Sequence, residues 1–307
     1  MSALTDVVFP VFLVVLAGFA ARRGGILSDA TMDALTRFAQ TFAIPCLLFG
    51  AISTIDIAES FDPALLVSFY VPALTCFAIG ILASRALGRP PEDAIAIGFC
   101  CLFSNSVLLG LPITERAFGT AALAPNYAII AFHAPVCYAV GIASMETARA
   151  GLGAGALRRI ASRAFGNALI IGIMIGLAVN LIGIPVPDPV TDATDLLGRA
   201  GLPTALFALG GVIARYDPRG ELRVVALVAI LSLVVHPALT WELGGAANLS
   251  EEQFRSAVVT ASMAPGVNAY LFATMYGRAS RVAAASVLVC TTLSLISASL
   301  WLSMLSV

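Results

Sequence analysis

The chain has 307 residues, of which 59% are hydrophobic and 11% are charged. This composition excludes a soluble globular domain and is typical of an all-α polytopic membrane protein. The formal net charge is -1 and all 17 basic residues are Arg, so neither nucleic-acid binding nor a basic lipid-binding tail is expected. The six Cys lie in apolar segments without a metal-ligand spacing. We therefore expect no metal site and no cofactor.

Ten apolar segments are long enough to cross a bilayer, alone or with an interruption. They are expected at residues 6–21, 33–53, 63–87, 93–119, 125–145, 164–183, 192–214, 221–243, 251–277 and 280–305. Glycines in residues 149–163 indicate a flexible cytoplasmic linker. This linker would separate a first five-helix unit, residues 1–148, from a second one, residues 164–307.

The fourth span, residues 93–119, contains residues that oppose a continuous helix. Ser104, Asn105 and Ser106 offer side-chain hydrogen bonds that compete with the helical ladder. Gly110 and Pro112 follow, and proline removes a backbone donor. One interpretation is a proline kink packed against neighbouring helices. The other is a broken helix, which the bilayer tolerates only where protein or a cavity satisfies the freed backbone groups.

A second interrupted span favours the broken-helix interpretation. Residues 251–277 also begin with acidic residues, and the sequence APGVN interrupts them at residues 264–268. Asp93 and Glu251, Gly119 and Gly277, and Pro45 and Pro203 are three pairs that each lie 158 residues apart. Interrupted spans at matching positions of two halves point to a transporter binding site. We predict that the two breaks meet near the middle of the bilayer.

The distribution of Arg residues predicts the orientation of the spans. The loops after the odd-numbered spans hold Arg22, Arg23, Arg37, Arg85, Arg89, Arg149, Arg158, Arg159, Arg163, Arg215, Arg219, Arg223, Arg278 and Arg281. The opposite side holds Arg116, Arg199 and Arg255. By the positive-inside rule, both termini face away from the cytoplasm. Five spans in each half give the halves opposite orientations, so the expected fold is a 5+5 inverted repeat.

Four motifs resemble the auxin efflux carrier family. They are FSNSVLLGLPITERAFG at residues 103–119, MAPGVNAYLFATMYG at residues 263–277, AIPCLLF at residues 43–49 and GLPTALF at residues 201–207. Bacterial members of this family are described as permeases for malonate, malate or other small organic anions. The chain differs from the plant carriers in lacking a long loop between the halves and in having Ser104-Asn105 where they have Pro-Asn.

The resemblance implies an arrangement and a mechanism. Spans 1, 2, 6 and 7 would form a scaffold that also makes a homodimer. Spans 3–5 and 8–10 would form a transport domain, with spans 4 and 9 crossing at their breaks. The transport domain would slide against the scaffold like an elevator. For a bacterial member, the resemblance also implies the cytoplasmic (inner) membrane as the location.

Two asparagines are the first candidates for substrate contact. A broken helix presents the positive end of a half-helix at membrane depth, which suits a carboxylate. Asn105 and Asn268 can each add amide donors there, or can simply cap the break. The full set of candidate substrate-binding residues is Asn105, Ser106, His133, Tyr138, Pro265, Gly266, Asn268 and Tyr270. Ser104, Gly110 and Pro112 are expected to shape the crossover.

The remaining candidates each have a structural alternative. His133 is an intramembrane ionisable residue, so it either serves the substrate or a proton, or is a neutral histidine held between helices. Tyr138 and Tyr270 either donate a hydroxyl or pack as aromatic rings. Pro45 and Pro203, on scaffold spans, are expected to pack, with a contribution to the cavity wall as the alternative.

These features predict a secondary transporter of small organic anions, such as malonate or malate. The alternative is a sodium- or proton-coupled symporter of larger organic anions, resembling the bile acid symporters. A cation antiporter is not favoured because the acidic residues lie at the ends of spans. No catalytic motif appears at a plausible spacing, so we do not expect an enzyme. The expected partners are the organic anion, the lipid bilayer and a second copy of the chain.

Overall fold

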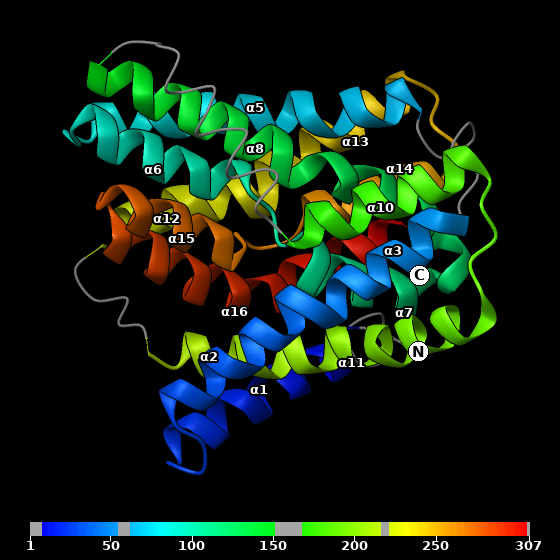
Figure 1. The fold of residues 1–307 in the computed structure, drawn as a ribbon. Helices are drawn as coiled ribbons and strands as arrows, with labels where there is room; N and C mark the ends of the chain where they lie inside the picture. The colour runs from blue at the N-terminus through cyan, green and yellow to red at the C-terminus, as the bar shows by residue number, and fades with distance from the viewer. Residues whose placement is uncertain (1–7, 55–61, 151–167, 216–220, 306–307) are drawn as a thin grey trace.

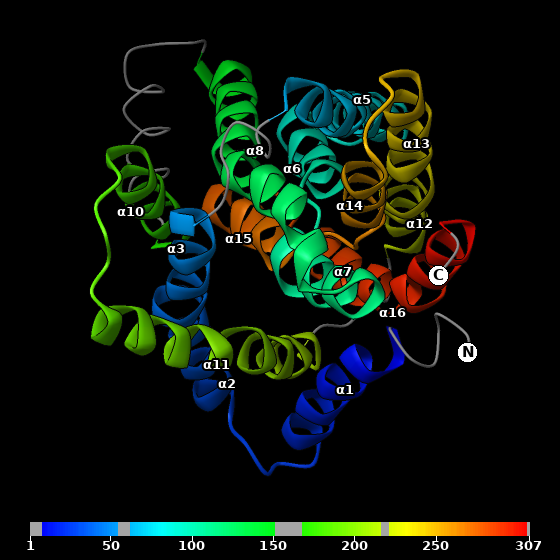
Figure 2. The ribbon, with the colours of Figure 1, turned by 90° about the vertical axis from the view of Figure 1, so that its right-hand side faces the viewer.

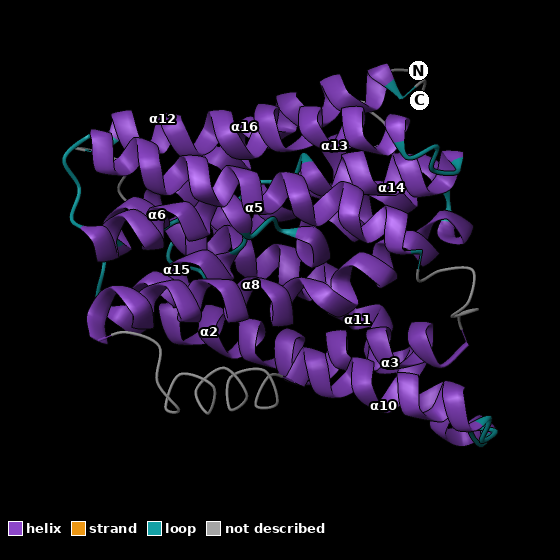
Figure 3. Cartoon of the chain, turned by 90° about the horizontal axis from the view of Figure 1, so that it is seen from above, coloured by secondary structure: helices purple, strands orange, loops and turns teal. Residues whose placement is uncertain are grey.

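The computed structural model describes residues 8–54, 62–150, 168–215 and 221–305, and within these ranges the chain forms helices and no strand (Figure 1). The all-α prediction is therefore confirmed for the described residues. Loops lie mainly at the ends of the helices, as Figure 3 shows. Most of the predicted linker, residues 151–163, lies outside the described residues.

Six helical stretches are long and apolar enough to cross a membrane. They are Asp29–Thr54, Pro63–Ala86, Ala124–Arg149, Asp188–Ile213, Leu222–Ala246 and Ser280–Met304. The other predicted spans correspond to two shorter helices, α1 and α10, and to two interrupted ones. The multi-pass character is thus supported, and the count of ten spans stays a prediction.

The helices pack as two groups. The first group consists of α1 (Phe9–Arg23), α2 (Asp29–Phe38), η2 (Ala39–Ala43), α3 (Ile44–Thr54), α10 (Ala168–Ile182) and α11 (Asp188–Ile213). These elements contact one another extensively. In Figure 2 they lie along the left and lower edges of the molecule.

The second group holds the two interrupted helices. It consists of α5 (Pro63–Ala86), α6 (Pro91–Leu102), η3 (Ser106–Gly110), α7 (Leu111–Phe118), η4 (Thr120–Leu123), α8 (Ala124–Ala150), α12 (Leu222–Ile230), η5 (Leu231–Val235), α13 (His236–Ala246), α14 (Glu251–Ala261), α15 (Val267–Tyr276) and α16 (Ser280–Met304). The principal contacts of these helices lie within the group. The two groups correspond to the spans predicted to form a scaffold and a transport domain.

Glycines allow close packing inside the first group. Gly18 of α1 lies against the backbone of Phe207, and Gly210 of α11 lies against the backbone of Val15. A side chain at either glycine would collide with backbone atoms, which cannot move aside. The two glycines thus allow α1 and α11 to approach closely.

Ion pairs at the helix ends hold each group together. Arg215, two residues beyond the end of α11, pairs with Asp29 at 2.7 Å and with Asp33 at 2.9 Å, both on α2. In the second group, Glu92 of α6 pairs with Arg149 at 3.0 Å and Arg278 at 2.7 Å. In the parts of the chain that the structure describes, every ion pair joins elements of the same group.

Three prolines follow π-helical turns and do not break the helix. The turns η2, η3 and η5 end two residues before Pro45, Pro112 and Pro237 respectively. A wider turn accommodates a proline, which clashes with the carbonyl four residues earlier and cannot hydrogen-bond to it. For Pro237 this carbonyl belongs to Leu233, and it accepts hydrogen bonds from Ser297 Oγ at 2.9 Å and Trp301 Nε1 at 3.0 Å.

The landmarks of the sequence repeat occupy matching places in the fold. Asp93 and Glu251 lie in the first turns of α6 and α14. Gly119 and Gly277 directly follow α7 and α15, with φ values of 86° and 65°. Residues other than glycine rarely adopt such values. The equivalence of the two interrupted spans thus extends from their first turn to their last.

Candidate functional site

The two interrupted helices meet at their interruptions. The first is non-helical at residues 103–105, and the second at residues 262–266. The backbone N–H of Asn105 donates to the carbonyl of Ala264 at 2.8 Å, and the N–H of Gly266 donates to the carbonyl of Phe103 at 3.0 Å. Ser104 and Pro265 thus form an antiparallel bridge. These hydrogen bonds satisfy backbone groups that a broken helix would leave unpaired inside a membrane.

The residues of the bridge explain why it forms at this point. Pro265 has no N–H, and the bridge needs none from it because its two donors are Asn105 and Gly266. Gly266 has φ of -73° and ordinary contact distances, so neither strain nor crowding requires a glycine there. Because Pro265 has no N–H, it cannot continue the backbone hydrogen bonding of α14. The chain stays extended there until α15 begins.

The position of the first break differs from the expectation in one respect. Ser104 lies in the break itself, but Gly110 and Pro112 lie beyond it, in η3 and in the first turn of α7. The π-helical turn before Pro112 removes the need for a break there. The residues that interrupt this span are therefore the polar ones. Gly110 and Pro112, which were expected to shape the crossover, lie in the helical part that follows it.

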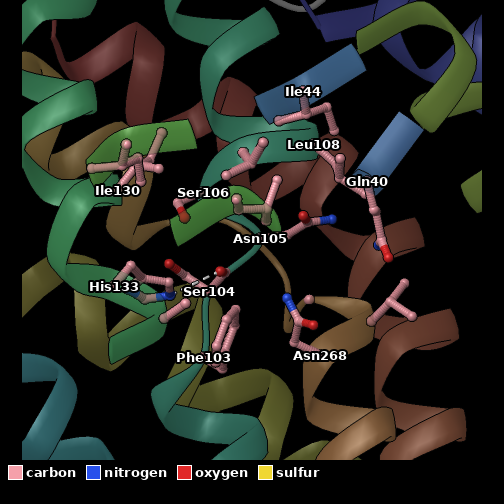
Figure 4. Close-up of a pocket in the computed structure, with 16 residues that line it drawn as sticks. Gln40, Ile44, Phe103, Ser104, Asn105, Ser106, Leu108, Ile130, His133 and Asn268 are labelled. Atoms are coloured by element: carbon pink, nitrogen blue, oxygen red, sulfur yellow. Dashed lines mark hydrogen bonds between the residues drawn. The ribbon is translucent and has the colours of Figure 1, made fainter. Parts of the chain in front are cut away.

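A cavity of about 40 Å³ lies beside the crossing (Figure 4). It is lined by Gln40, Ile44, Phe103, Ser104, Asn105, Ser106, Val107, Leu108, Ile130, His133, Ala134, Leu169, Ile173, Gly266, Val267 and Asn268. The first residues of η3 and of α15 are among them. Because the first N–H groups of a helix have no partner within it, both helices present donors and a positive dipole end to the cavity.

The amide of Asn105 is the main polar group of the cavity. This side chain is 5% exposed, and its Nδ2 has no hydrogen-bond partner among the described residues. Asn268 lies across the cavity, and its Oδ1 accepts a hydrogen bond of 3.4 Å from the hydroxyl of Tyr138. Figure 4 shows the amides of Asn105, Asn268 and Gln40 around the same space. The arrangement suits a ligand that accepts hydrogen bonds.

His133 of α8 also lines the cavity, and its ring holds the break. Its Nε2 lies 3.1 Å from the carbonyl oxygen of Ser104. A carbonyl oxygen only accepts, so Nε2 carries the proton of this hydrogen bond. Nδ1 lies 3.8 Å from Cys137 Sγ, and the ring packs edge-on against Phe103. These contacts correspond to the alternative of a neutral histidine held between helices.

Of the other predicted residues, some line the cavity and some do not. Ser106 lines it with a buried side chain. Pro265 belongs to the bridge, and Tyr270 lies two residues beyond Asn268 on α15; neither lines the cavity. Pro45 and Pro203 do not line it either: Pro45 packs against Gly172 of α10, and Pro203 is exposed on α11. Pro45 therefore serves in packing between helices, the first of the two roles considered for it.

Sequence reasoning missed the wall that the first group contributes. Gln40, in the π-helical turn η2, brings an amide to the cavity, and Ile44, Leu169 and Ile173 bring apolar side chains. A polar residue inside an apolar span, five residues before Pro45, was a signal that could have identified Gln40. The isoleucines and Leu169 carry no such signal, because apolar residues occur throughout these spans.

Comparisons with known proteins identify the family of the chain. A protein of Rhizobium meliloti named "Putative malonate transporter" is 27% identical, over 96% of this chain and 93% of its own length. Uncharacterized transporters of Methanothermobacter thermautotrophicus and Methanocaldococcus jannaschii are each 24% identical; the matches cover 97% and 96% of this chain and 97% of each relative. The family model described as "Membrane transport protein" matches residues 3–156 and 156–302. The chain therefore belongs to this membrane transport family, the auxin efflux carrier family that its motifs resemble.

Proposed function

We propose that the protein is a secondary transporter of small mono- or dicarboxylates, such as malonate or malate, which bind where the interrupted helices cross. The observation that carries this proposal is the buried Nδ2 of Asn105, which has no partner among the described residues and lines the cavity between two helix N-termini. A carboxylate oxygen would accept from this donor and from the N–H groups of η3 and α15.

The free energies involved favour an anionic ligand. A buried amide donor without a partner costs about 1–3 kcal/mol, which a bound carboxylate would recover. Each helix N-terminus adds about 0.3–1 kcal/mol for a negative group, and more where the site is buried. The name of the Rhizobium meliloti relative agrees with a small dicarboxylate.

The packing of the two helix groups supports an elevator mechanism. One contact between the groups is a buried apolar cluster in which Ile44, Leu48 and Ile173 of the first group meet Leu108, Leu111 and Ile130 of the second. An apolar contact can slide without leaving unpaired polar groups, whereas the ion pairs lie within the groups. The second group would carry the crossing and its ligand past the first.

The proposal retains the membrane arrangement expected from the sequence. Ten spans would result from the six long helices, α1, α10 and the two interrupted pairs. The positions of the Arg residues support a topology in which both termini lie outside the cytoplasm of a bacterial cell, with the protein in the inner membrane. The apolar residues exposed on α10 and α11, among them Leu181, Ile182 and Leu196, would face lipid or the second copy of a homodimer.

Transport by purified protein in liposomes tests the function. We expect uptake of labelled malonate or malate, competition by other small carboxylates, and no competition by a bile acid. The variant Asn105→Ala should lose uptake by at least about tenfold while keeping its thermal unfolding temperature, because it removes one charge-assisted hydrogen bond worth about 1.5–3 kcal/mol. Full uptake by this folded variant would contradict the proposed site.

A further inference from the structure

An apolar groove runs between α1 of the first helix group and α16 of the second, which lie beside each other in Figure 2. Its volume is about 340 Å³. Both helices supply side chains to its walls, among them Phe12, Leu16, Phe19, Leu288, Thr292 and Leu295. Ile213, the last residue of α11, also lines it. The groove therefore lies at a boundary between the two helix groups.

The groove has the length of one lipid leaflet. Its lining on α1 extends from Phe9 to Phe19, which is about 15 Å of helix at a rise of about 1.5 Å per residue. Half of a hydrocarbon core of about 30 Å has the same thickness. Phe9 and Leu16 have exposed fractions of 48% and 57%, so the groove is open to the surface of the molecule. In a protein that spans a membrane, such a surface faces acyl chains.

Each of the two helices carries an arginine on the face that lines the groove. Arg23 follows Phe19 by one turn of α1, and its guanidinium carbon lies 5.8 Å from the centre of the Phe19 ring. Arg281 precedes Leu288 by two turns of α16, a spacing that returns to the same face. Figure 1 shows α1 and α16 running in opposite directions, so the end of α1 and the start of α16 lie on the same side of the molecule. Both arginines therefore lie beyond the same end of the groove.

The two arginines are exposed, and neither forms an ion pair within the part of the chain that the structure describes. Asp29, the acidic residue that follows Arg23 most closely in the chain, pairs instead with Arg22 at 2.6 Å and with Arg215 at 2.7 Å. The groove thus combines an apolar body with a positively charged end.

We propose that this groove binds an anionic phospholipid, with an acyl chain between α1 and α16 and the phosphate at Arg23 and Arg281. Guanidinium groups suit this partner because they bind phosphate oxygens through charge-assisted hydrogen bonds. The Arg-rich side of the molecule is the one expected to face the cytoplasm, and anionic lipids give the cytoplasmic leaflet its negative surface potential. Basic pockets between membrane-spanning helices on that side bind anionic head groups in other proteins.

A second copy of the chain fits the groove less well than a lipid does. In a symmetric dimer within a membrane, a face meets the same face of its copy at the same depth. Arg23 would then approach the same arginine of the copy, and the like charges would repel each other. The phosphate of a lipid brings the opposite charge to this place.

A lipid bound in this groove would contact both helix groups at once, through α1 and α11 on one side and α16 on the other. A ligand that fits one arrangement of the two groups shifts the population toward that arrangement. Anionic lipid would therefore change the rate at which the second group slides past the first. This consequence rests on the proposed function; the lipid site itself does not.

Thermal unfolding of the purified protein in a neutral detergent tests the lipid site without any carboxylate. The probes are phosphatidylglycerol and phosphatidylcholine with identical acyl chains, titrated into separate samples. We expect a saturable rise in unfolding temperature with phosphatidylglycerol, at a concentration at least about tenfold lower than phosphatidylcholine requires. Glycerol 1-phosphate, which has the charge but no acyl chain, should give no such rise because it buries no apolar surface.

Two pairs of variants separate the charge from the groove. Arg23→Gln combined with Arg281→Gln should lose the preference for phosphatidylglycerol, whereas Arg37→Gln, which removes an exposed arginine of α2 outside the groove, should keep it. Leu16→Trp should narrow the groove and weaken the apparent affinity for both lipids by about tenfold, whereas Leu300→Trp should not. Leu16 and Leu300 have similar exposed fractions, 57% and 61%, but only Leu16 lines the groove.

Equal responses of the wild type to the two phospholipids would overturn the proposal, as would an unchanged preference in the double arginine variant. If Leu16→Trp altered the oligomeric state measured by light scattering and left both lipid responses unchanged, the groove would instead be an interface between copies of the chain. These measurements contain no malonate, so a failure of the lipid site leaves the proposed function standing, and a failure of malonate binding leaves the lipid site standing.

Discussion

The ring of His133 is hydrogen-bonded, at 3.1 Å, to the backbone carbonyl of Ser104 in the middle of the first break. A side chain from α8 thereby fixes the non-helical segment from which Asn105 projects. This link makes the histidine a positioning residue, because its effect on a ligand would pass through Ser104 and Asn105.

Replacing His133 should distort the break. His133→Ala is expected to weaken malonate binding by about tenfold or more, since it leaves the Ser104 carbonyl, in a buried position, without its partner. His133→Gln keeps a donor and should recover most of the affinity. Isothermal titration calorimetry with malonate measures the Kd of both variants. If transport in His133→Gln lost its dependence on a proton gradient while binding stayed normal, the histidine would have a proton-linked role instead.

Gln40, in the first helix group, is expected to contribute to the affinity for malonate. Its amide lies at the cavity beside residues of the crossing, so Gln40→Leu is expected to raise the Kd for malonate about fivefold to tenfold, the effect of one hydrogen bond of about 1–1.5 kcal/mol. The unfolding temperature should not fall. Thr36→Val, one turn earlier on α2, is a control that leaves the lining of the cavity intact. An unchanged Kd in Gln40→Leu would mean that the ligand does not reach the first group.

The close contact between α1 and α11 should not tolerate a side chain. Gly210→Val would force the two backbones apart, and we expect a loss of stability of at least about 1–3 kcal/mol. Thermal unfolding in detergent measures the loss. The same kind of change at Gly245, where no atom lies within 4 Å of the added carbon, should have little effect. Equal stability of the two variants would contradict the close packing of the first group.

Glu92 predicts a pH dependence of stability at the Arg-rich end of the second group. Partial burial acts to raise the pKa of Glu92, but hydrogen bonds and charge from Arg149 and Arg278 outweigh it and hold the pKa below the ordinary value of 4.5. A carboxyl group with a lowered pKa stabilises the fold above its unfolded-state pKa, and this contribution is lost as the pH falls through the folded value.

Thermal unfolding of the wild type and of Glu92→Gln between pH 7 and pH 3.5 tests this dependence. The wild type should be the more stable at pH 7, and the difference should shrink below about pH 4.5. A difference that stays constant over this range would show that the carboxylate charge does not stabilise the contact.

The sequence by itself determined the membrane class, the positions of the interrupted spans and the repeat that relates them. These features depend on local properties. Apolar runs must be helical in lipid, Ser104-Asn105 and Pro265 oppose a helix wherever they occur, and a repeat is visible in the order of residues. The family assignment followed from motifs around the same breaks.

Only the tertiary structure decided which residues form the site. Pro112 was expected to help shape the first break, but a π-helical turn accommodates it, and the break lies earlier, at residues 103–105. Gln40 reaches the cavity because the two helix groups meet there, and Asn126 meets Thr260 across 134 residues of chain. Contacts between residues far apart in the chain depend on how the helices pack around one another. The order of residues does not encode that packing in any local pattern.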